Sequence, residues 1–175
     1  TNGGAIYVGK MSYMDMADCS MFRDSATEGG AMVALTSASA TLSNIKITRG
    51  LGSHAILCIG SDIRLFHSLL SDSRNGGLAG EFCFSETINS TFSNLGGAMN
   101  FVSKSDVKIT NSLFLNNTAT TLQPDGGGLF MKNGKSTYIE STLFLGNTAK
   151  RGGAVALFNS KQVVLSDTVY FGENV

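Results

Sequence analysis

FLNNTATTLQPDGGGL (residues 114–129) and FLGNTAKRGGAV (residues 144–155) are two copies of one pattern. Each copy begins with Phe-x-x-Asn-Thr-Ala, continues through a linker, and ends in Gly-Gly followed by small or apolar residues. Two landmarks that alternate in a fixed order are typical of a repeat protein, in which each unit buries its apolar face against its neighbours. The remainder of the chain aligns on these two copies.

The Gly-Gly landmark recurs along the whole chain at intervals of 20 to 30 residues, once a degraded copy, SHAI, is counted at Ser53. The full pairs are Gly3–Gly4, Gly29–Gly30, Gly76–Gly77, Gly96–Gly97, Gly126–Gly127 and Gly152–Gly153. Glycine permits a backbone corner that a Cβ atom forbids, and it leaves room for an adjacent coil. We therefore expect these pairs to mark one corner of successive coils.

The second landmark is an aromatic residue followed three positions later by Asn or Ser. The copies are Phe22 with Ser25, Phe114 with Asn117, Phe144 with Asn147 and Phe171 with Asn174, while Phe92 heads a truncated copy and Ile47 and Leu70 replace the aromatic in coils two and three. We expect the aromatic residues, with Tyr170 or Phe171 in the last coil, to stack in one buried file. The asparagines are predicted to form an amide ladder at a turn, where Asn tolerates a left-handed φ.

The segments between the landmarks are short and strand-like, with polar and apolar residues alternating at period two, as in residues 107–114 and 137–144. No stretch carries a capped helical stripe. This pattern predicts an all-β fold, a right-handed parallel β-helix of about seven coils that forms a single domain over residues 1–175. A β-propeller is the alternative, but its blades of about 40 residues are longer than these repeats.

The composition argues against several classes of protein. Glycine accounts for 21 of 175 residues, Pro124 is the single proline, and 42% of residues are hydrophobic, which argues against disorder. Thirteen basic and thirteen acidic residues balance, so we expect no nucleic-acid partner. No apolar run is long enough to cross a bilayer, so we expect no direct membrane insertion by this segment. Both ends cut a repeat, which we interpret as a fragment of a longer solenoid.

The three cysteines leave two readings open. Cys58 and Cys83 lie in apolar, strand-like runs, where a buried thiol behaves as a small hydrophobic residue. A disulfide between them is the other possibility, because neighbouring strands bring Cα atoms within bridging range. Cys19 would then stay unpaired, and no Cys/His cluster suggests a metal.

A β-helical glycosidase or lyase would need carboxylates at the same position of successive coils. Asp15 and Asp18 form the closest acidic pair, but the matching positions in the next coils are Asn44 and His67. Asp72, Arg74 and Asp125 fall in expected turns, and His54 and His67 have no third ligand in view. The sequence therefore predicts no catalytic residue, no cofactor and no metal site.

Two asparagines match the glycosylation pattern Asn-x-Ser/Thr, namely Asn89 in Asn-Ser-Thr and Asn116 in Asn-Asn-Thr. Asn116 lies at an expected turn and is the better candidate. The pattern is relevant only in a chain that passes through a eukaryotic secretory route. The alternative is a chance match, because Asn, Ser and Thr are abundant in this sequence.

The alternating Gly-Gly-Ala-(Ile/Leu/Val) and Phe-x-x-Asn motifs resemble the repeats of the chlamydial polymorphic outer membrane proteins and of related repeat proteins in other bacteria and protists. The resemblance extends from Gly3 to Asn174 and is best in the two copies quoted above. It implies a right-handed β-helical passenger on a cell surface and, in the bacterial family, a role in adhesion. Coils two and three depart from it, since they lack the aromatic and the Asn.

These observations favour a cell-surface or extracellular structural or adhesive scaffold without catalytic activity. Its partners would be a protein or glycan ligand, flanking repeats of the same chain, or further copies stacked through the coil ends, whose strand edges are unpaired. The alternatives are a carbohydrate-active β-helical enzyme and a subunit of an extracellular filament.

Overall fold

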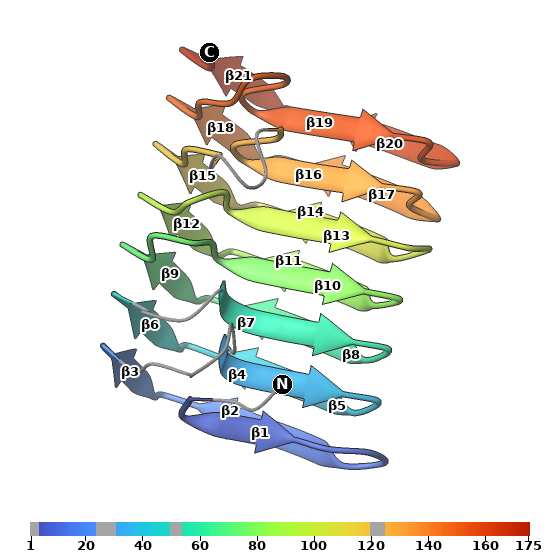
Figure 1. The fold of residues 1–175 in the computed structure, drawn as a ribbon. Helices are drawn as coiled ribbons and strands as arrows, with labels where there is room; N and C mark the ends of the chain where they lie inside the picture. Colours follow the sequence, from blue (N-terminus) through green and yellow to red (C-terminus); the bar gives the residue numbers. More distant parts are fainter. Residues whose placement is uncertain (1–3, 24–30, 50–53, 120–124) are drawn as a thin grey trace.

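The computed structural model describes residues 4–23, 31–49, 54–119 and 125–175. These residues contain 21 strands and no helix, and the strands form three seven-stranded sheets (Figure 1). Every pairing is parallel, and each strand pairs with the strands one coil below and one coil above it. The fold is thus the right-handed parallel β-helix that the repeats predict, with about six turns between the seven levels.

Each coil contributes one strand to each sheet in turn. The first sheet contains β1 (Ile6–Val8), β4 (Ala31–Thr36), β7 (His54–Ile59), β10 (Leu78–Glu81), β13 (Met99–Val102), β16 (Leu129–Lys132) and β19 (Val155–Phe158). The second contains β2 (Tyr13–Ala17), β5 (Ser39–Ser43), β8 (Asp62–Phe66), β11 (Phe84–Ile88), β14 (Asp106–Thr110), β17 (Ser136–Glu140) and β20 (Gln162–Ser166). The third contains β3 (Ser20–Phe22), β6 (Lys46–Thr48), β9 (Leu69–Ser71), β12 (Thr91–Ser93), β15 (Leu113–Leu115), β18 (Leu143–Leu145) and β21 (Tyr170–Gly172).

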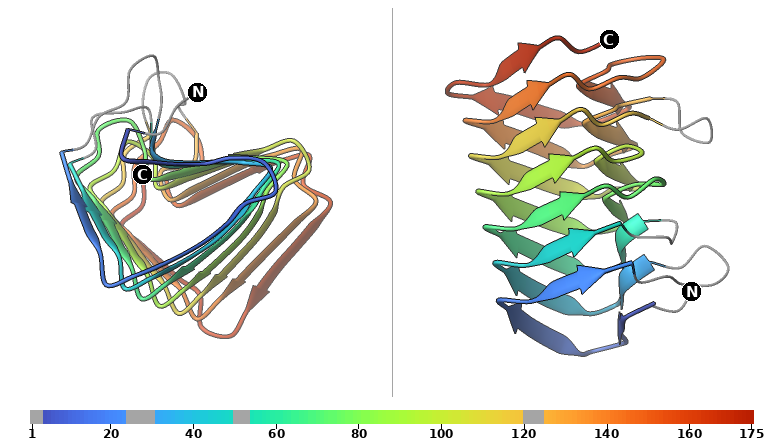
Figure 2. Two further views of the ribbon diagram at one scale, coloured as in Figure 1. Left: turned by 90° about the horizontal axis from the view of Figure 1, so that it is seen from below. Right: turned by 90° about the vertical axis from the view of Figure 1, so that its left-hand side faces the viewer.

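Viewed along its axis, the solenoid has three sides that enclose the core (Figure 2). We call the bend between the first and second sheets the first corner, that between the second and third sheets the second corner, and the return to the first sheet the third corner. Inward side chains of all three sheets form one continuous hydrophobic cluster. The alternating burial along β5, β14 and β17 follows from the period of two in a strand.

The inward position of the third sheet is the predicted aromatic file. Phe92, Phe114 and Phe144 are fully buried, and their rings stack with centroid separations of 5.0 Å and 4.6 Å. Ile47 and Leu70 occupy the same file, as expected. Phe171 takes this position in the last coil and stacks on Phe144 at 5.3 Å, which resolves the choice between Phe171 and Tyr170, but it is 45% exposed and not buried as predicted.

The prediction for Phe22 is wrong. Its neighbour Met21 pairs with Ile47 and occupies the inward file, whereas Phe22 points outward and is 55% exposed. The cause is the period of two in a strand, because a shift of one residue turns a side chain to the opposite face. The guanidinium groups of Arg23 and Arg49 lie 5.2 Å and 5.7 Å from the centroid of the Phe22 ring. Ser25, predicted as the partner of Phe22, lies outside the described residues.

The amide ladder is present at the third corner, but its backbone conformation differs from the prediction. Nδ2 of Asn117 donates to Oδ1 of Asn147, and Nδ2 of Asn147 donates to Oδ1 of Asn174. The left-handed φ belongs to the preceding residue of each coil, as in Asn116 (52°) and Gly146 (64°). The ladder asparagines are therefore free to turn their amides inward and bond the backbone of the coil below.

The Gly-Gly pairs lie where the chain enters the first sheet, as expected of a corner. Gly126 has a φ of 65°, and a Cβ atom on Gly127 would lie 2.5 Å from the carbonyl oxygen of Gly153 in the next coil. The pair Gly76–Gly77 is shifted by one residue from the later copies, since Leu78 pairs with Met99. Gly3, Gly29 and Gly30 lie outside the described residues.

Candidate functional site

The acidic file considered for catalysis lies at the second corner. Asp18, Asn44 and His67 share a left-handed φ of 49° to 55°, and Asn89, Asn111, Ser141 and Asp167 continue the same position in the later coils. Nδ2 of Asn44 donates to Oδ1 of Asp18 over 2.6 Å. Asp15 lies apart from this file, exposed on the outer face of β2. The file therefore forms a polar turn in which one carboxylate already accepts an amide.

A ladder of Ser and Thr hydroxyl groups lies next to this file, and the sequence analysis did not predict it. Ser90 Oγ donates to the carbonyl of Ile88 and accepts from the backbone N–H of Ser68, one coil below. Ser112 and Thr142 repeat the arrangement in the coils above. Its sequence signal is a polar residue followed by Ser or Thr just before the strands β9, β12, β15 and β18 of the third sheet, as in Asn89-Ser90 and Asn111-Ser112. The ladder satisfies buried backbone groups at the corner.

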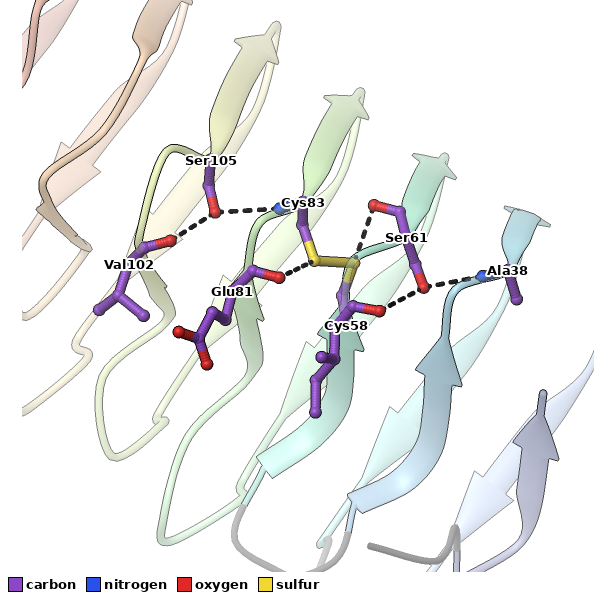
Figure 3. Close-up of a disulfide and its surroundings, with 8 residues drawn as sticks. Ala38, Cys58, Ser61, Glu81, Cys83, Val102 and Ser105 are labelled. Atoms are coloured by element: carbon purple, nitrogen blue, oxygen red, sulfur yellow. Dashed lines mark hydrogen bonds between the residues drawn. A yellow bond between two sulfur atoms is a disulfide. The ribbon is translucent and has the colours of Figure 1, made fainter. Parts of the chain in front are cut away.

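Cys58 and Cys83 form a disulfide between coils three and four (Figure 3). Cys83 lies at a first-corner position that carries Ser61 in the coil below and Ser105 in the coil above. Each of these serines accepts a backbone N–H from the preceding coil, so the cysteine replaces a hydroxyl position with a covalent bond. Cys58 pairs in register with Gly80, where a Cβ atom would lie 2.5 Å from the Phe101 ring and 3.2 Å from Cβ of Cys83.

Both cysteines of this disulfide are buried, with relative exposures of 0% for Cys58 and 3% for Cys83. Of the two readings that the sequence left open, the disulfide is the one that the structure has. Cys19 is a free, partly buried thiol.

Most other candidate acids are engaged in contacts that stabilise corners or outer faces. Asp125 accepts from Nε and Nη2 of Arg151, at 2.8 Å and 2.6 Å, and this hydrogen bonding lowers the pKa of Asp125. The Arg151 guanidinium also lies 4.8 Å from the centroid of the Phe158 ring. Asp72 accepts from Asn94 and Ser71, and Arg74 is exposed. Asp125 and Arg151 thus hold two successive coils together at the third corner.

The outer face of the second sheet carries a short charge ladder. Glu86 pairs in register with Arg64 below and Lys108 above. Its carboxylate lies 2.9 Å from Lys108 Nζ and 3.6 Å from Arg64 Nε. Because opposite charges alternate along this file, neighbouring strands gain modest pairing energy and no charge is left concentrated on the face.

The two histidines are far from forming a ligand set. The sequence places His54 at the second glycine of the motif, but in the structure it pairs with Ala31, the residue after the Gly-Gly pair of coil two; burial lowers the pKa of His54. Its Nδ1 atom has no hydrogen-bond partner within the described part of the chain. His67 is exposed at the second corner. Across residues 4–23, 31–49, 54–119 and 125–175, no group of three or more His, Cys, Asp or Glu is placed to hold a metal ion.

The two glycosylation patterns lie at different corners. Asn89 is exposed at the second corner and Asn116 at the third, each with a left-handed φ. Thr91, the hydroxyl residue of the first pattern, is half-buried in β12, and Thr118 of the second is exposed. Both acceptor amides thus face outward, whereas Asn117, beside Asn116, is buried in the amide ladder.

A shallow hollow of about 430 Å³ lies over the first corner of coils one to three. Its lining includes Met11, Tyr13, Ser37, Ser39 and Asp62. Tyr13, Ser39 and Asp62 follow one another in register on β2, β5 and β8. The hollow could not be predicted from the sequence, because it depends on how many residues form the first corner of each coil.

Comparison with known proteins places the fold in a family. A family model described as a right handed beta helix region matches residues 30–174. No curated protein matches the chain, and no solved structure matches it. In the described ranges there is no helix of the length and apolar character that a membrane span requires.

Proposed function

The chain belongs to the right-handed β-helix family, and on that premise we propose that it is a cell-surface or extracellular scaffold without catalytic activity. Its coils would present a rigid outer surface to a protein or glycan ligand, in the manner of the polymorphic outer membrane proteins that its repeats resemble. That the chain is a β-helical repeat scaffold follows from its family and its fold. The location, the adhesive role and the absence of catalysis are the proposal.

The observation that carries the proposal is the buried disulfide between Cys58 and Cys83. Disulfides form and persist in oxidising compartments such as the cell exterior, and cytosolic reductants keep thiols reduced. This bond joins two successive coils and closes no active site, so its role is that of a structural staple.

The polar files support a scaffold rather than an enzyme. A β-helical glycosidase or lyase needs carboxylates gathered on adjacent coils. Here Asp18 is bonded to Asn44, Asp125 to Arg151, and Glu86 to Lys108. Each of these three carboxylates has a partner, and the three lie apart, at the second corner, at the third corner and on the outer face of the second sheet.

Two measurements test the proposal. Labelling of intact native cells with a membrane-impermeant amine reagent should modify exposed lysines such as Lys46 and Lys161, with a cytosolic protein as the unlabelled control. Labelling only after lysis would contradict the surface location. Screening of the purified protein against polyuronates and β-glucans, with and without calcium, should give no turnover. Reproducible turnover abolished by Asp18→Ala would instead favour the carbohydrate-active enzyme.

A further inference from the structure

Coil one concentrates the sulfur atoms of this chain. Four of the seven methionines and one of the three cysteines lie within residues 11–21, which read MSYMDMADCSM. Three of these methionines turn inward, since Met14 and Met16 alternate with exposed residues along β2 and Met21 is the buried residue of β3. Cys19 lies at the second corner between the two strands and packs against the core. Four sulfur-containing side chains therefore face the inside of one coil.

The same four positions carry no sulfur in coils two to seven. In coil two they are occupied by Ala40, Leu42, Ile45 and Ile47. In the later coils they hold aliphatic, aromatic or hydroxyl side chains. Methionine is a common filler of irregular gaps in a core, but the adjoining coil fills these positions with ordinary aliphatic residues. Packing alone therefore requires no sulfur here.

Met16, Cys19 and Met21 surround the inner side of the second corner. Met16 is the last inward residue of β2 and Met21 is the inward residue of β3. Asp18, with a left-handed φ of 55°, turns the chain between them. The thiol of Cys19 donates to the carbonyl of Ala17 over 3.0 Å, which holds Sγ beside the end of β2. Because methionine is unbranched and has three rotatable side-chain bonds, the thioethers on either side are able to meet this thiol.

The surroundings of these sulfur atoms are apolar. Within residues 4–23 there is no histidine, and the two acidic side chains point away from the core. Asp15 is exposed on the outer face of β2, and the exposed Asp18 accepts a hydrogen bond from Asn44. The coil-two residues directly above the sulfur layer are at most 3% exposed. A ligand on the inner side of this corner would therefore meet sulfur and hydrocarbon.

This combination of ligands selects a soft, monovalent metal ion. Thiolate and thioether sulfur favour Cu(I), whereas carboxylate and carbonyl oxygen suit harder ions. A single thiolate supplies one negative charge and the thioethers supply none, so a monovalent ion makes the site neutral. A divalent ion would leave a net positive charge against an apolar layer, which is costly. The sequence predicts no metal site because it contains no Cys/His cluster, but thioether ligands need no histidine.

We propose that Met16, Cys19 and Met21 form a binding site for Cu(I), with Met14 as a further sulfur ligand on the same strand. On binding, the Cys19 thiol loses its proton to solvent and the thiolate sulfur bonds the ion. Met16 and Met21 contribute thioether lone pairs. The ion enters and stays as Cu(I), so the step needs no oxidant or reductant. This metal site goes beyond the proposed scaffold role and does not depend on it.

The test is an anaerobic titration of the purified protein with Cu(I), in competition with the chromophoric chelator bicinchoninate. We expect the parent to retain one Cu(I) per chain, Cys19→Ser to retain none, and Met16→Leu and Met21→Leu each to bind about tenfold or more weakly. The substitutions suit the fold, because Ser68 and Leu42 occupy matching positions in other coils. Ag(I), which has the same charge and undergoes no redox change, should give the same order by calorimetry.

Met11→Leu is the matched control, because Met11 belongs to the same coil but is 99% exposed, and it should leave the affinity unchanged. A second readout is maleimide labelling of Cys19, the free thiol, which Ag(I) should slow in the parent and less in Met16→Leu. The inference is overturned if bicinchoninate removes all Cu(I) from the parent, or if Met16→Leu and Met21→Leu bind like the parent. It is also overturned if Met11→Leu weakens binding as much as they do, or if Zn(II) displaces Cu(I). All of these outcomes leave the scaffold proposal intact, since surface labelling tests it separately.

Discussion

Asn117 donates a hydrogen bond from Nδ2 to Oδ1 of Asn147, one coil above it, over 2.8 Å. The same oxygen accepts the backbone N–H of Asn117 at 3.1 Å, and Nδ2 of Asn147 bonds the carbonyl of Phe114. Both asparagines are fully buried. One side chain therefore satisfies polar groups of the coil below it, and the solenoid is held together by a polar file as well as by its apolar core.

Removal of this side chain should be costly. Asn147→Ala would remove the side-chain partner of the buried backbone N–H of Asn117 and of the carbonyl of Phe114, while Nδ2 of Asn117 keeps its bond to the carbonyl of Phe92. At about 1–3 kcal/mol for each unsatisfied buried group, we expect the free energy of unfolding to fall by about 3–5 kcal/mol. Urea denaturation followed by circular dichroism measures this loss. Asn116→Gly is the control, because the exposed Asn116 has a left-handed φ that glycine adopts, and it should change stability by less than about 0.5 kcal/mol. Equal losses in the two variants would show that the ladder contributes little.

The aromatic file gives a second prediction. Phe114 is fully buried between Phe92 and Phe144, so Phe114→Ala creates a cavity and should cost about 3–5 kcal/mol. Phe22→Ala removes a ring of the same size from the surface and gives up only its contacts with two arginines, so it should cost less than about 1 kcal/mol. Thermal melting of the two variants compares them. A Phe22 variant that melts as low as the Phe114 variant would contradict the inward position of Met21.

The fold could be predicted because its determinants recur in the sequence. Phe114 and Phe144, and Asn117 and Asn147, repeat at one spacing, and a parallel coil must place repeated residues above one another. The prediction was wrong where local register decided the outcome. The side chain of Phe22 resembles those of the other file members, but Met21 is the residue whose strand position faces inward.

The disulfide and the hollow depend on contacts that no repeat encodes. Cys58 and Cys83 lie in successive coils at positions where the other coils carry no cysteine, so the repeat pattern does not predict whether the two are bonded. The hollow lies where a first corner of four residues in coil one adjoins corners of two residues in coils two and three, which carry the small residues Ser37 and Gly60. Corner lengths can be compared only once the residues at which the strands begin and end are known.

His54 should make stability depend on pH. Burial lowers its pKa from the ordinary value of 6.5, so the folded state disfavours the protonated ring and the unfolded state takes up the proton first. The contribution of the neutral ring is complete above pH 6.5 and is lost as the pH falls below that value. Melting temperatures between pH 7.5 and 5 should fall in the parent. They should fall less in His54→Gln, which does not titrate in this range. Parallel curves for the two proteins would refute a buried neutral His54.

The disulfide should stabilise the fold through the unfolded state. Its two cysteines are 25 residues apart, for which chain entropy predicts about 3.5 kcal/mol. The double variant Cys58→Ser/Cys83→Ser should lose about that amount in urea denaturation, and reducing agent should lower the parent toward it. Cys19→Ser, the control, removes a thiol that forms no disulfide and should behave like the parent. An unchanged midpoint in the double variant would show that the bond is not a structural staple.

The redox state of this pair in native cells tests the central claim most directly. Intact cells would be quenched with an alkylating reagent under acid, and peptides containing Cys58 and Cys83 would then be mapped by mass spectrometry without reduction. An extracellular β-helical scaffold predicts that the two peptides are recovered joined, while Cys19 is alkylated. Recovery of Cys58 and Cys83 as separate alkylated peptides would place the protein in a reducing compartment and contradict the account.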